Sequence, residues 1–344
     1  MSNPGFNWLH LTDLHFGLSG QKELWPTVKA AFFDDLAKLS EKCGPWDAVL
    51  FTGDFVQKGS RDEYQRLDDE VLGPLWEKLA ELGSGDAVLQ AVPGNHDLVR
   101  PAIGRTPSAA EKFLLKPELF ANVADEFWSE PNGEYRAVVN NAFENFLRWR
   151  EDNEFARRVF PAEGLLPGDF ALSLELAEER RVGVLGLNTT FLQLAGGDYT
   201  GKLAWDLRQA TTACGGDLPA WIAEHDVCLL LTHQGPEWLD DRGRDEVYPE
   251  INPAGRFAVH LFGHMHENVV RSTSTGGGKP LRQWQGNSLF SMEPIETPSG
   301  GKQIERRDGS NSRRHRPSCG TGRDHPSNAR AAVGNSSRII RAAG

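Results

Sequence analysis

Residues 87–97 read Ala-Val-Leu-Gln-Ala-Val-Pro-Gly-Asn-His-Asp, a short apolar run that passes directly into a polar turn. The run has the length and composition of a buried strand, and the Pro-Gly pair ends it. Glycine at this point permits a sharp turn and a close backbone approach. The stretch therefore predicts a strand whose end presents Asn95, His96 and Asp97.

Four other predicted strands end in the same way. They lie near Asn7–Thr12, Ala48–Thr52, Val227–Thr232 and Ala258–Phe262. The polar residues that follow them are, in chain order, Asp13, His15, Asp54, His233, His264 and His266. Ligand sites of α/β sheets form outside the carboxyl ends of the strands, so we expect the five endings to converge on one rim.

Predicted helices alternate with these strands. The helices are expected at Trp25–Lys42, Asp62–Leu82, Leu203–Ala213 and Leu218–His225, and further strands near Phe170–Leu176, Val182–Leu187 and Leu281–Trp284. This alternation favours a layered α/β fold. An insertion at about 100–168 breaks the rhythm with two predicted helices, Ala109–Trp128 and Tyr135–Arg158. Such an insertion is either a lid or binding element at the site or a packed accessory helical pair, and the sequence leaves both open.

Charge divides the 344 residues into two parts. The chain has a formal net charge of −11, but residues 299–344 hold ten Lys or Arg against three Asp or Glu, which leaves 27 against 45 in the rest. An acidic body disfavours nucleic-acid binding, because phosphate neutralisation supplies most non-specific affinity. Residues 299–344 contain no aromatic residue, and we expect a disordered basic tail after a catalytic domain at 1–298. A basic tail that binds nucleic acid or a partner, and an altered or truncated reading frame, stay open as alternatives.

The sequence also bears on location. No window approaches the ~18 consecutive apolar residues of a membrane helix, and no signal peptide is predicted, so no membrane partner is expected. The four cysteines lie far apart without a C-x-x-C pair, which excludes a disulfide scaffold and a Cys-rich zinc module. We expect a cytoplasmic protein. The oligomeric state does not follow from the sequence.

The residue types at the strand ends suit transition metals. Carboxylate and amide oxygens together with imidazole nitrogens favour Mn, Fe, Zn or Co over Ca or Mg. Side chains two apart in an extended segment point the same way, so the D-x-H and H-x-H pairs each present two ligands together. G-N-H-D at 94–97 is the most specific element of the set.

Taken in order, D-x-H, G-D, G-N-H-D, a lone His and G-H-x-H resemble the calcineurin-like metallophosphoesterases over about residues 6–292. The resemblance implies a four-layer α-β-β-α sandwich of two mixed sheets, a dinuclear metal centre and a bridging hydroxide as nucleophile. By motif, it implies that Asp13, His15 and His266 hold one metal, that Asn95, His233 and His264 hold the other, and that Asp54 bridges them. It also implies that His96 is a catalytic group and that Asp97 orients it. Manganese is expected first, with iron, zinc or cobalt as alternatives.

Within this family the residues favour a phosphodiesterase. Gly53-Asp54 is not followed by the acidic-Arg-Gly stretch of the phosphoprotein phosphatases, which also use G-N-H-E. The opening Asp13-Leu14-His15-Phe16-Gly17 is similar to phosphodiesterases and repair nucleases, although Gln234 stands where a second His is often found. We expect hydrolysis of a nucleotide or another small diester. The alternatives are a DNA nuclease of the same superfamily and an effector module that acts through partner binding.

Other polar residues are interpreted structurally. His10 and His260 lie inside predicted strands and are expected in the core, and His225 is expected at a helix end. Asp68 and Asp69 lie on a helical face and are interpreted as solvated surface.

Overall fold

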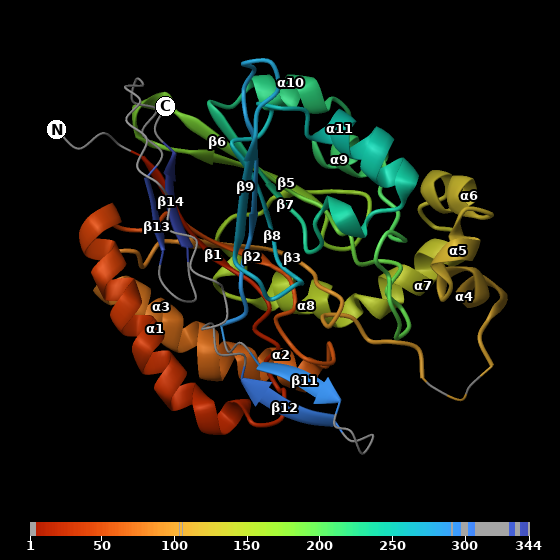
Figure 1. Cartoon of the computed structure of the whole chain (residues 1–344), viewed down its shortest axis with the longest axis horizontal. Helices are drawn as coiled ribbons and strands as arrows, with labels where there is room; N and C mark the ends of the chain where they lie inside the picture. The colour runs from red at the N-terminus through yellow and green to blue at the C-terminus, as the bar shows by residue number, and fades with distance from the viewer. Residues whose placement is uncertain are drawn as a thin grey trace.

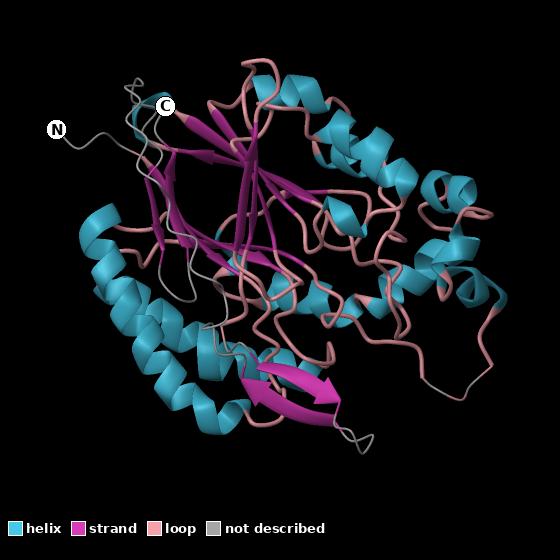
Figure 2. Ribbon diagram, viewed as in Figure 1, coloured by secondary structure: helices cyan, strands magenta, loops and turns pink. Residues whose placement is uncertain are grey.

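The computed structural model describes residues 5–102, 104 and 106–289, and beyond them the backbone of four strands, 292–296, 302–306, 330–333 and 338–342. Two sheets lie face to face, and helices cover the outer face of each (Figures 1 and 2). The chain is therefore a four-layer α-β-β-α sandwich with two mixed sheets, as the sequence predicts.

The first sheet has the order β13-β14-β1-β2-β3. Its strands are β1 (Phe6–Leu11), β2 (Ala48–Thr52), β3 (Val88–Val92), β13 (Arg330–Val333) and β14 (Arg338–Ala342). β1, β2 and β3 are parallel, whereas β14 is antiparallel to β1 and to β13. The carboxyl ends of β1, β2 and β3 consequently lie at one edge of the sheet.

The second sheet has the order β4-β5-β6-β7-β8-β10-β9. Its strands are β4 (Ala162–Glu163), β5 (Phe170–Glu175), β6 (Arg181–Gly186), β7 (Val227–Leu231), β8 (Val259–Phe262), β9 (Val269–Thr273) and β10 (Leu281–Gln285). The four strands β6, β7, β8 and β10 are parallel to their neighbours in this group, and the remaining pairings are antiparallel. A separate hairpin joins β11 (Met292–Glu296) to β12 (Lys302–Arg306).

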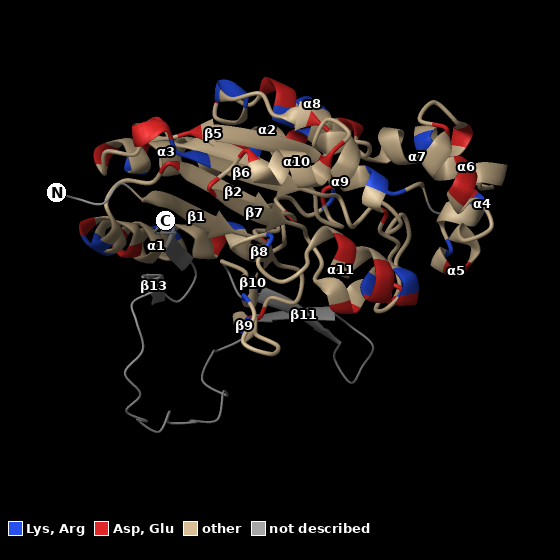
Figure 3. Cartoon of the chain, turned by 90° about the horizontal axis from the view of Figure 1, so that it is seen from above, with Lys and Arg blue, Asp and Glu red and all other residues tan. Residues whose placement is uncertain are grey.

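The helices lie outside the two sheets. They are α1 (Gln21–Cys43), α2 (Arg61–Leu67), α3 (Gly73–Glu81), α4 (Ala109–Leu114), α5 (Pro117–Phe120), α6 (Ala124–Ser129), α7 (Glu134–Ala142), α8 (Glu144–Asp152), α9 (Leu207–Ala213), α10 (Leu218–Ala223) and α11 (Tyr248–Ile251). α1, α3 and α8 cover the first sheet, and α9, α10 and α11 cover the second (Figure 1). Along the ribbon, the positions of Lys, Arg, Asp and Glu lie mainly on these outer helices and on loops (Figure 3).

Side-chain alternation along the strands builds three apolar interfaces between the four layers. In β2, Ala48 and Leu50 face the second sheet, while Val49 and Phe51 face the helices. β7 alternates in the same way, because Leu229 packs between the sheets and Leu230 packs toward α9 and α10. Strands buried on both faces read as continuous apolar runs, which is why the sequence predicts them well.

The helix predicted at Asp62–Leu82 is interrupted by a π-helical turn at Asp68–Leu72. Pro74 has no N–H for the carbonyl of Glu70, four residues earlier, and proline inside a helix disturbs it for this reason. The Trp25 indole donates to the Glu70 carbonyl over 3.0 Å in its place. Asp68 is not simple solvated surface, since it accepts hydrogen bonds from Trp149 and Asn153, each at 2.8 Å.

The insertion at about 100–168 is packed into the fold. Its first predicted helix is three short helices, α4, α5 and α6, because Lys116 before Pro117 adopts an extended backbone. Phe146 and Trp149 of α8 are buried against Phe55 in the core beneath the first sheet. The structure thus favours a packed helical pair for the second half of the insertion.

The range 299–344, for which the sequence predicts disorder, contains the strands β12, β13 and β14. Its remaining residues lie outside those described, as does Cys319. Cys43, Cys214 and Cys228 are free thiols. None of the described helices has both the length and the apolar character needed to cross a bilayer.

Candidate metal centre

The ends of five strands, from both sheets, meet at one place. The amide of His264, after β8, donates to the Asp13 carboxylate after β1 over 2.9 Å. The Nδ1 of His233, after β7, lies 2.7 Å from the carbonyl of Thr52 at the end of β2. The loops that follow the strands are therefore tied to one another across the two sheets, and the predicted convergence is observed.

The backbone at these strand ends is strained. Seven non-glycine residues of the described chain have positive φ, and five of them are Asp13, His15, Asp54, His264 and His266, with φ between 48° and 75°. Such conformations cost of order 1–3 kcal/mol each and cluster at functional sites. The fold holds these side chains in an unfavourable local geometry, which points to a function for their placement.

Asp54 lies at the middle of the cluster. Its Oδ2 is 3.6 Å from His15 Nε2 and 3.3 Å from His233 Nε2. Its Oδ1 accepts the backbone N–H of His96 over 2.7 Å. One carboxylate thus faces two groups of imidazoles, one on each side.

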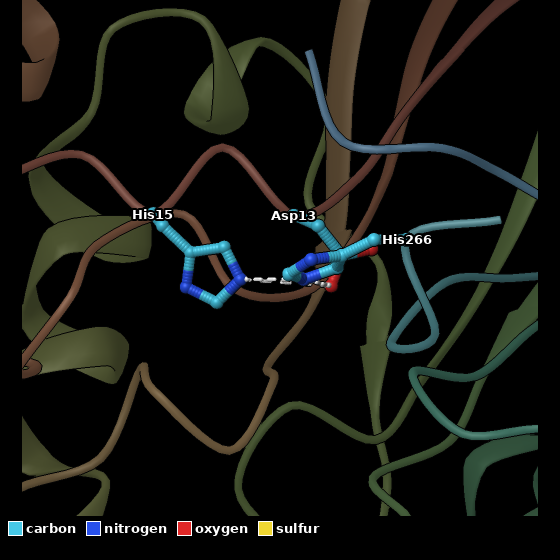
Figure 4. A group of neighbouring side chains, drawn as sticks. All are labelled: Asp13, His15 and His266. Carbon is cyan, nitrogen blue, oxygen red and sulfur yellow. Dashed lines mark hydrogen bonds and ion pairs between the residues drawn. The ribbon is translucent and has the colours of Figure 1, made fainter. Parts of the chain in front are cut away.

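The first group consists of Asp13, His15 and His266 (Figure 4). The two Nε2 atoms of the histidines point at each other and are 2.9 Å apart. Asp13 Oδ1 lies 3.4 Å from His266 Nε2 and 3.9 Å from His15 Nε2. These donor atoms converge on a common point from two strand ends distant in the sequence.

The second group consists of His233, His264 and Asn95, again next to Asp54. His233 Nε2 lies 3.2 Å from His264 Nδ1 and 3.2 Å from Asn95 Oδ1. His233 is fully buried, and its Nδ1 contact with Thr52 fixes the ring so that Nε2 faces the cluster.

Glycine is required at two of the turns. A side chain at Gly53, whose φ is 92°, would collide with the His233 ring and with the backbone of Gly94. A side chain at Gly94 would overlap the Asp54 carboxylate. The glycines of G-D and G-N-H-D therefore allow the carboxylate to lie directly against the neighbouring loop.

His96 lies beside the cluster, with its ring edge-to-face on His15 at 4.7 Å between centroids. Its Nδ1 contacts the carbonyl of Gln57 at 2.9 Å. Within the described part of the chain no hydrogen bond joins Asp97 to the His96 ring, and the orientation of His96 by Asp97 stays a prediction.

Asp97 instead organises the backbone around Asp54. Its carboxylate accepts the N–H groups of Asp54 and Gly94, each at 2.7 Å, of Phe55 at 2.9 Å and of Val56 at 3.2 Å. The carboxyl group is fully buried. Burial and the charge of Asp54 raise the pKa of Asp97 to about 7, against the effect of these donors.

The electrostatics of the cluster favour an ionised Asp13 and neutral rings of His15 and His264, whereas the ring of His233 favours its protonated form. Burial opposes ionisation of Asp13, but the contacts with His266 and the charge of His233 outweigh it and lower the pKa of Asp13 to about 2. Burial lowers the pKa of His15 to about 4, and burial together with His233 lowers the pKa of His264 to about 3. Burial also opposes the charge of His233, but Asp54 raises the pKa of that ring to about 9.

This donor set fits two cations. Imidazole nitrogens face one another at hydrogen-bond distances, and two buried carboxylates face them without Lys or Arg in an ion pair within the described chain. Buried charges are normally paired or bind metals. Donor atoms of Asp54 lie together with those of His233 and His264 on one side and with those of His15 and His96 on the other.

The sequence did not single out several residues at the rim. The Arg100 guanidinium donates to the carbonyls of Asn95 at 3.1 Å and Gln193 at 3.4 Å. The Trp238 ring packs edge-to-face on His264, with the centroids 4.1 Å apart. Gln234 is buried and contacts Thr189 and Gln193, so its side chain supports a loop. Only spatial proximity identifies Arg100 and Trp238, because neither belongs to the motifs, whereas Gln234 stands out in the sequence as the residue after His233.

Residues 6–268 match the family model described as calcineurin-like phosphoesterase. The chain belongs to this family. Calcineurin-like phosphoesterases depend on a dinuclear metal centre, and the groups around Asp54 are candidate ligands for it. The resemblance of the sequence to this family is thereby confirmed.

Solved structures give weaker similarities to this phosphoesterase. A dimetal phosphatase from Danio rerio is 11% identical with a TM-score of 0.39, covering 83% of this chain and 88% of that one. The calcineurin-like phosphoesterase YfkN from Bacillus subtilis is 13% identical with a TM-score of 0.40, covering 88% and 91%. The purple acid phosphatase PPD1 from yellow lupin (Lupinus luteus) is 12% identical with a TM-score of 0.40, covering 88% and 48%. Identities and TM-scores as low as these carry no argument about the substrate. Among curated protein sequences, none matches this chain.

Proposed function

We propose that this metal-dependent phosphoesterase hydrolyses phosphodiesters, of a nucleotide or another small molecule, at a pair of divalent ions. Asp13, His15 and His266 would hold one ion, Asn95, His233 and His264 the other, and Asp54 both. The position of Asp54 carries the proposal, since one of its oxygens lies within 3.6 Å of an imidazole nitrogen from each group. Manganese is the first choice, with iron, zinc or cobalt as alternatives.

When bound, two such ions would polarise the phosphoryl group and lower the pKa of the attacking water. The chain's own residues contribute orientation. Asp97 fixes the loop that carries Asp54 through four backbone N–H groups, and His96 fixes one Asp54 oxygen through its amide. The Asp54 carboxylate is therefore already held in one orientation before it binds the two ions.

His96 is the proposed proton donor to the leaving group. The contact of its Nδ1 with the Gln57 carbonyl makes Nδ1 an N–H donor and leaves Nε2 as the nitrogen that would carry the proton donated to the leaving group. The His96 side chain is only half-buried, so this edge of the site is open. A positioned acid of this kind typically contributes 10²–10⁴-fold to the rate.

Two observations support a diester over a monoester. The sequence lacks the Arg that follows Gly-Asp in phosphoprotein phosphatases, which would help to hold a dianion. At the rim, Arg100 supplies one cation without a carboxylate partner among the described residues, which suits a substrate with a single negative charge.

The test compares bis(p-nitrophenyl) phosphate with p-nitrophenyl phosphate on Mn-loaded protein, and adds single-stranded DNA. We expect kcat/KM to be higher for the diester than for the monoester, and no cleavage of DNA. A clear preference for the monoester would reject the diesterase, and faster cleavage of DNA would favour the nuclease alternative. Binding of a partner protein without any turnover would favour the effector module.

A further inference from the structure

Apolar side chains border the candidate metal centre on the side of His264. Among the described residues the large hydrophobic side chains with high exposure are Val99, Phe160, Met265 and Val270. Met265 is 42% exposed and stands between His264 and His266 in the sequence. An exposed thioether at this position has no evident role in folding, because its side chain is not part of a core cluster.

Trp238 adjoins the same imidazole. It ends the short 3₁₀ turn Pro236–Trp238, which follows His233 by three residues, and its ring stands at 86° to the His264 ring. One part of the indole packs on the core beneath, and part stays accessible to solvent.

The backbone fixes the position of this ring. The Trp238 carbonyl accepts the N–H groups of Lys202 at 3.2 Å and Leu203 at 3.0 Å, and its N–H donates to Gly235 over 3.1 Å. A partly exposed aromatic ring that is held rigidly beside a charged site loses little entropy when a ligand lies on it. The metal centre therefore has a preformed apolar border and not only polar ligands.

We propose that Trp238 and Met265 form a platform for a flat aromatic group of the substrate, so that the enzyme favours nucleoside or aryl diesters over alkyl diesters. The inference rests on the proposed diesterase function and specifies its substrate class. Aromatic side chains stack on bases of any sequence, and a thioether adds favourable contacts with rings. The group on the platform is the ester substituent that stays on phosphorus, because the leaving group must lie toward the His96 proton donor.

The test uses three diesters with the same p-nitrophenolate leaving group. The retained group is methyl, p-nitrophenyl or thymidine, so chemistry at the leaving group is constant and only the group on the platform changes. The ratio of kcat/KM for the thymidine ester to kcat/KM for the methyl ester reports the platform. In Trp238→Leu we expect this ratio to fall by about 5- to 100-fold, the range of base stacking on one aromatic ring.

Controls separate stacking from support of His264. Trp221→Leu removes a partly buried tryptophan that packs on His225 at 4.4 Å, a similar pair outside the site, and should leave the ratio unchanged. Trp238→Phe keeps an aromatic face and should retain most of the ratio. Met265→Ala changes an exposed side chain, so it should fold even if Trp238→Leu does not, and we expect a smaller fall in the same ratio.

Two outcomes would overturn the platform while leaving the diesterase in place. The first is an unchanged ratio in both Trp238→Leu and Met265→Ala. The second is an equal loss on the methyl and thymidine esters together with lost metal, which would make Trp238 a support for His264 only. If the wild-type protein hydrolyses none of the three esters with any of the four metals, the diesterase and the platform both fail.

Discussion

Replacing His96 with Asn separates metal binding from chemistry. The structure suits this substitution because the Asn amide nitrogen occupies about the position of the imidazole Nδ1, and can donate to the Gln57 carbonyl that lies 2.9 Å from that atom. The His96 backbone N–H, which holds Asp54 Oδ1 at 2.7 Å, is unaffected. The variant therefore loses the ring edge that exchanges a proton and little else.

We expect kcat to fall by ~10²–10⁴-fold on a diester with an alkoxide leaving group, which corresponds to about 3–5 kcal/mol at 1.36 kcal/mol per decade. The loss should be smaller on bis(p-nitrophenyl) phosphate, because p-nitrophenolate departs without a proton. Metal content should stay at the wild-type value. The assay is steady-state kinetics on both substrates with elemental analysis of the same samples.

A control with matched contacts is His225→Asn. The His225 Nδ1 also contacts a backbone carbonyl, that of Trp221, at 2.7 Å, but it lies outside the site. That variant should keep full activity. One ring nitrogen of His96 lies within 4.8 Å of the donor atoms of His15 and Asp54, so a ligand role is the competing interpretation. Loss of metal in His96→Asn, or an equal loss on both leaving groups, would refute the proton donor.

Three further predictions concern stability. Asp97→Ala leaves four backbone N–H groups without their acceptor and should lower the free energy of unfolding of metal-free protein by about 3 kcal/mol or more. His96→Asn should not lower this free energy. Equal urea midpoints of the two variants would contradict the structural role of Asp97. Burial lowers the pKa of His260 to about 3 from 6.5, so the stability that its neutral form contributes is present above pH 6.5 and is lost as the pH falls. Wild-type protein should lose about 2 kcal/mol more than His260→Gln between pH 7 and pH 5, and parallel melting curves would show that His260 does not titrate in this way. Phe146→Ala should cost about 3–5 kcal/mol in urea unfolding, because the ring is fully buried, while Phe160→Ala, at 80% exposure in the same insertion, should cost under about 0.5 kcal/mol; similar small values would mean that α8 is not part of the core.

The sequence predicts the strands that build the site because each is buried on both faces and ends in polar residues. Val269–Thr273 escapes prediction, since this edge strand is largely exposed and has no apolar alternation. The break in the helix at Asp68–Leu72 depends on Pro74 and on the Trp25 indole. That indole lies 45 residues before its acceptor, Glu70, and therefore outside any local pattern. Local periodicity thus predicts buried helices and strands, and it fails where a residue distant in the sequence determines the local structure.

The same distinction applies to the site. The seven candidate ligands and His96 are found together, as the motifs predict, because the ends of parallel strands must meet at one edge. The partners of Asp97 could not be predicted, since its four donors are backbone groups brought near by the fold. His10 and His260 are confirmed as buried, hydrogen-bonded residues of the strands, and His225 lies just after α10. Trp238 and Arg100 emerge only from their contacts.

The metal content of wild-type protein and of Asp54→Ala tests the central claim most directly. After incubation with Mn and removal of free ions, elemental analysis should give about two metals per chain for wild type, because the two imidazole groups share this one carboxylate. Asp54→Ala should lose most of both ions, while Asp68→Ala, which removes a carboxylate far from the strand ends, should keep both. Wild-type protein without metal, or Asp54→Ala with two metals, would contradict a dinuclear centre built around Asp54.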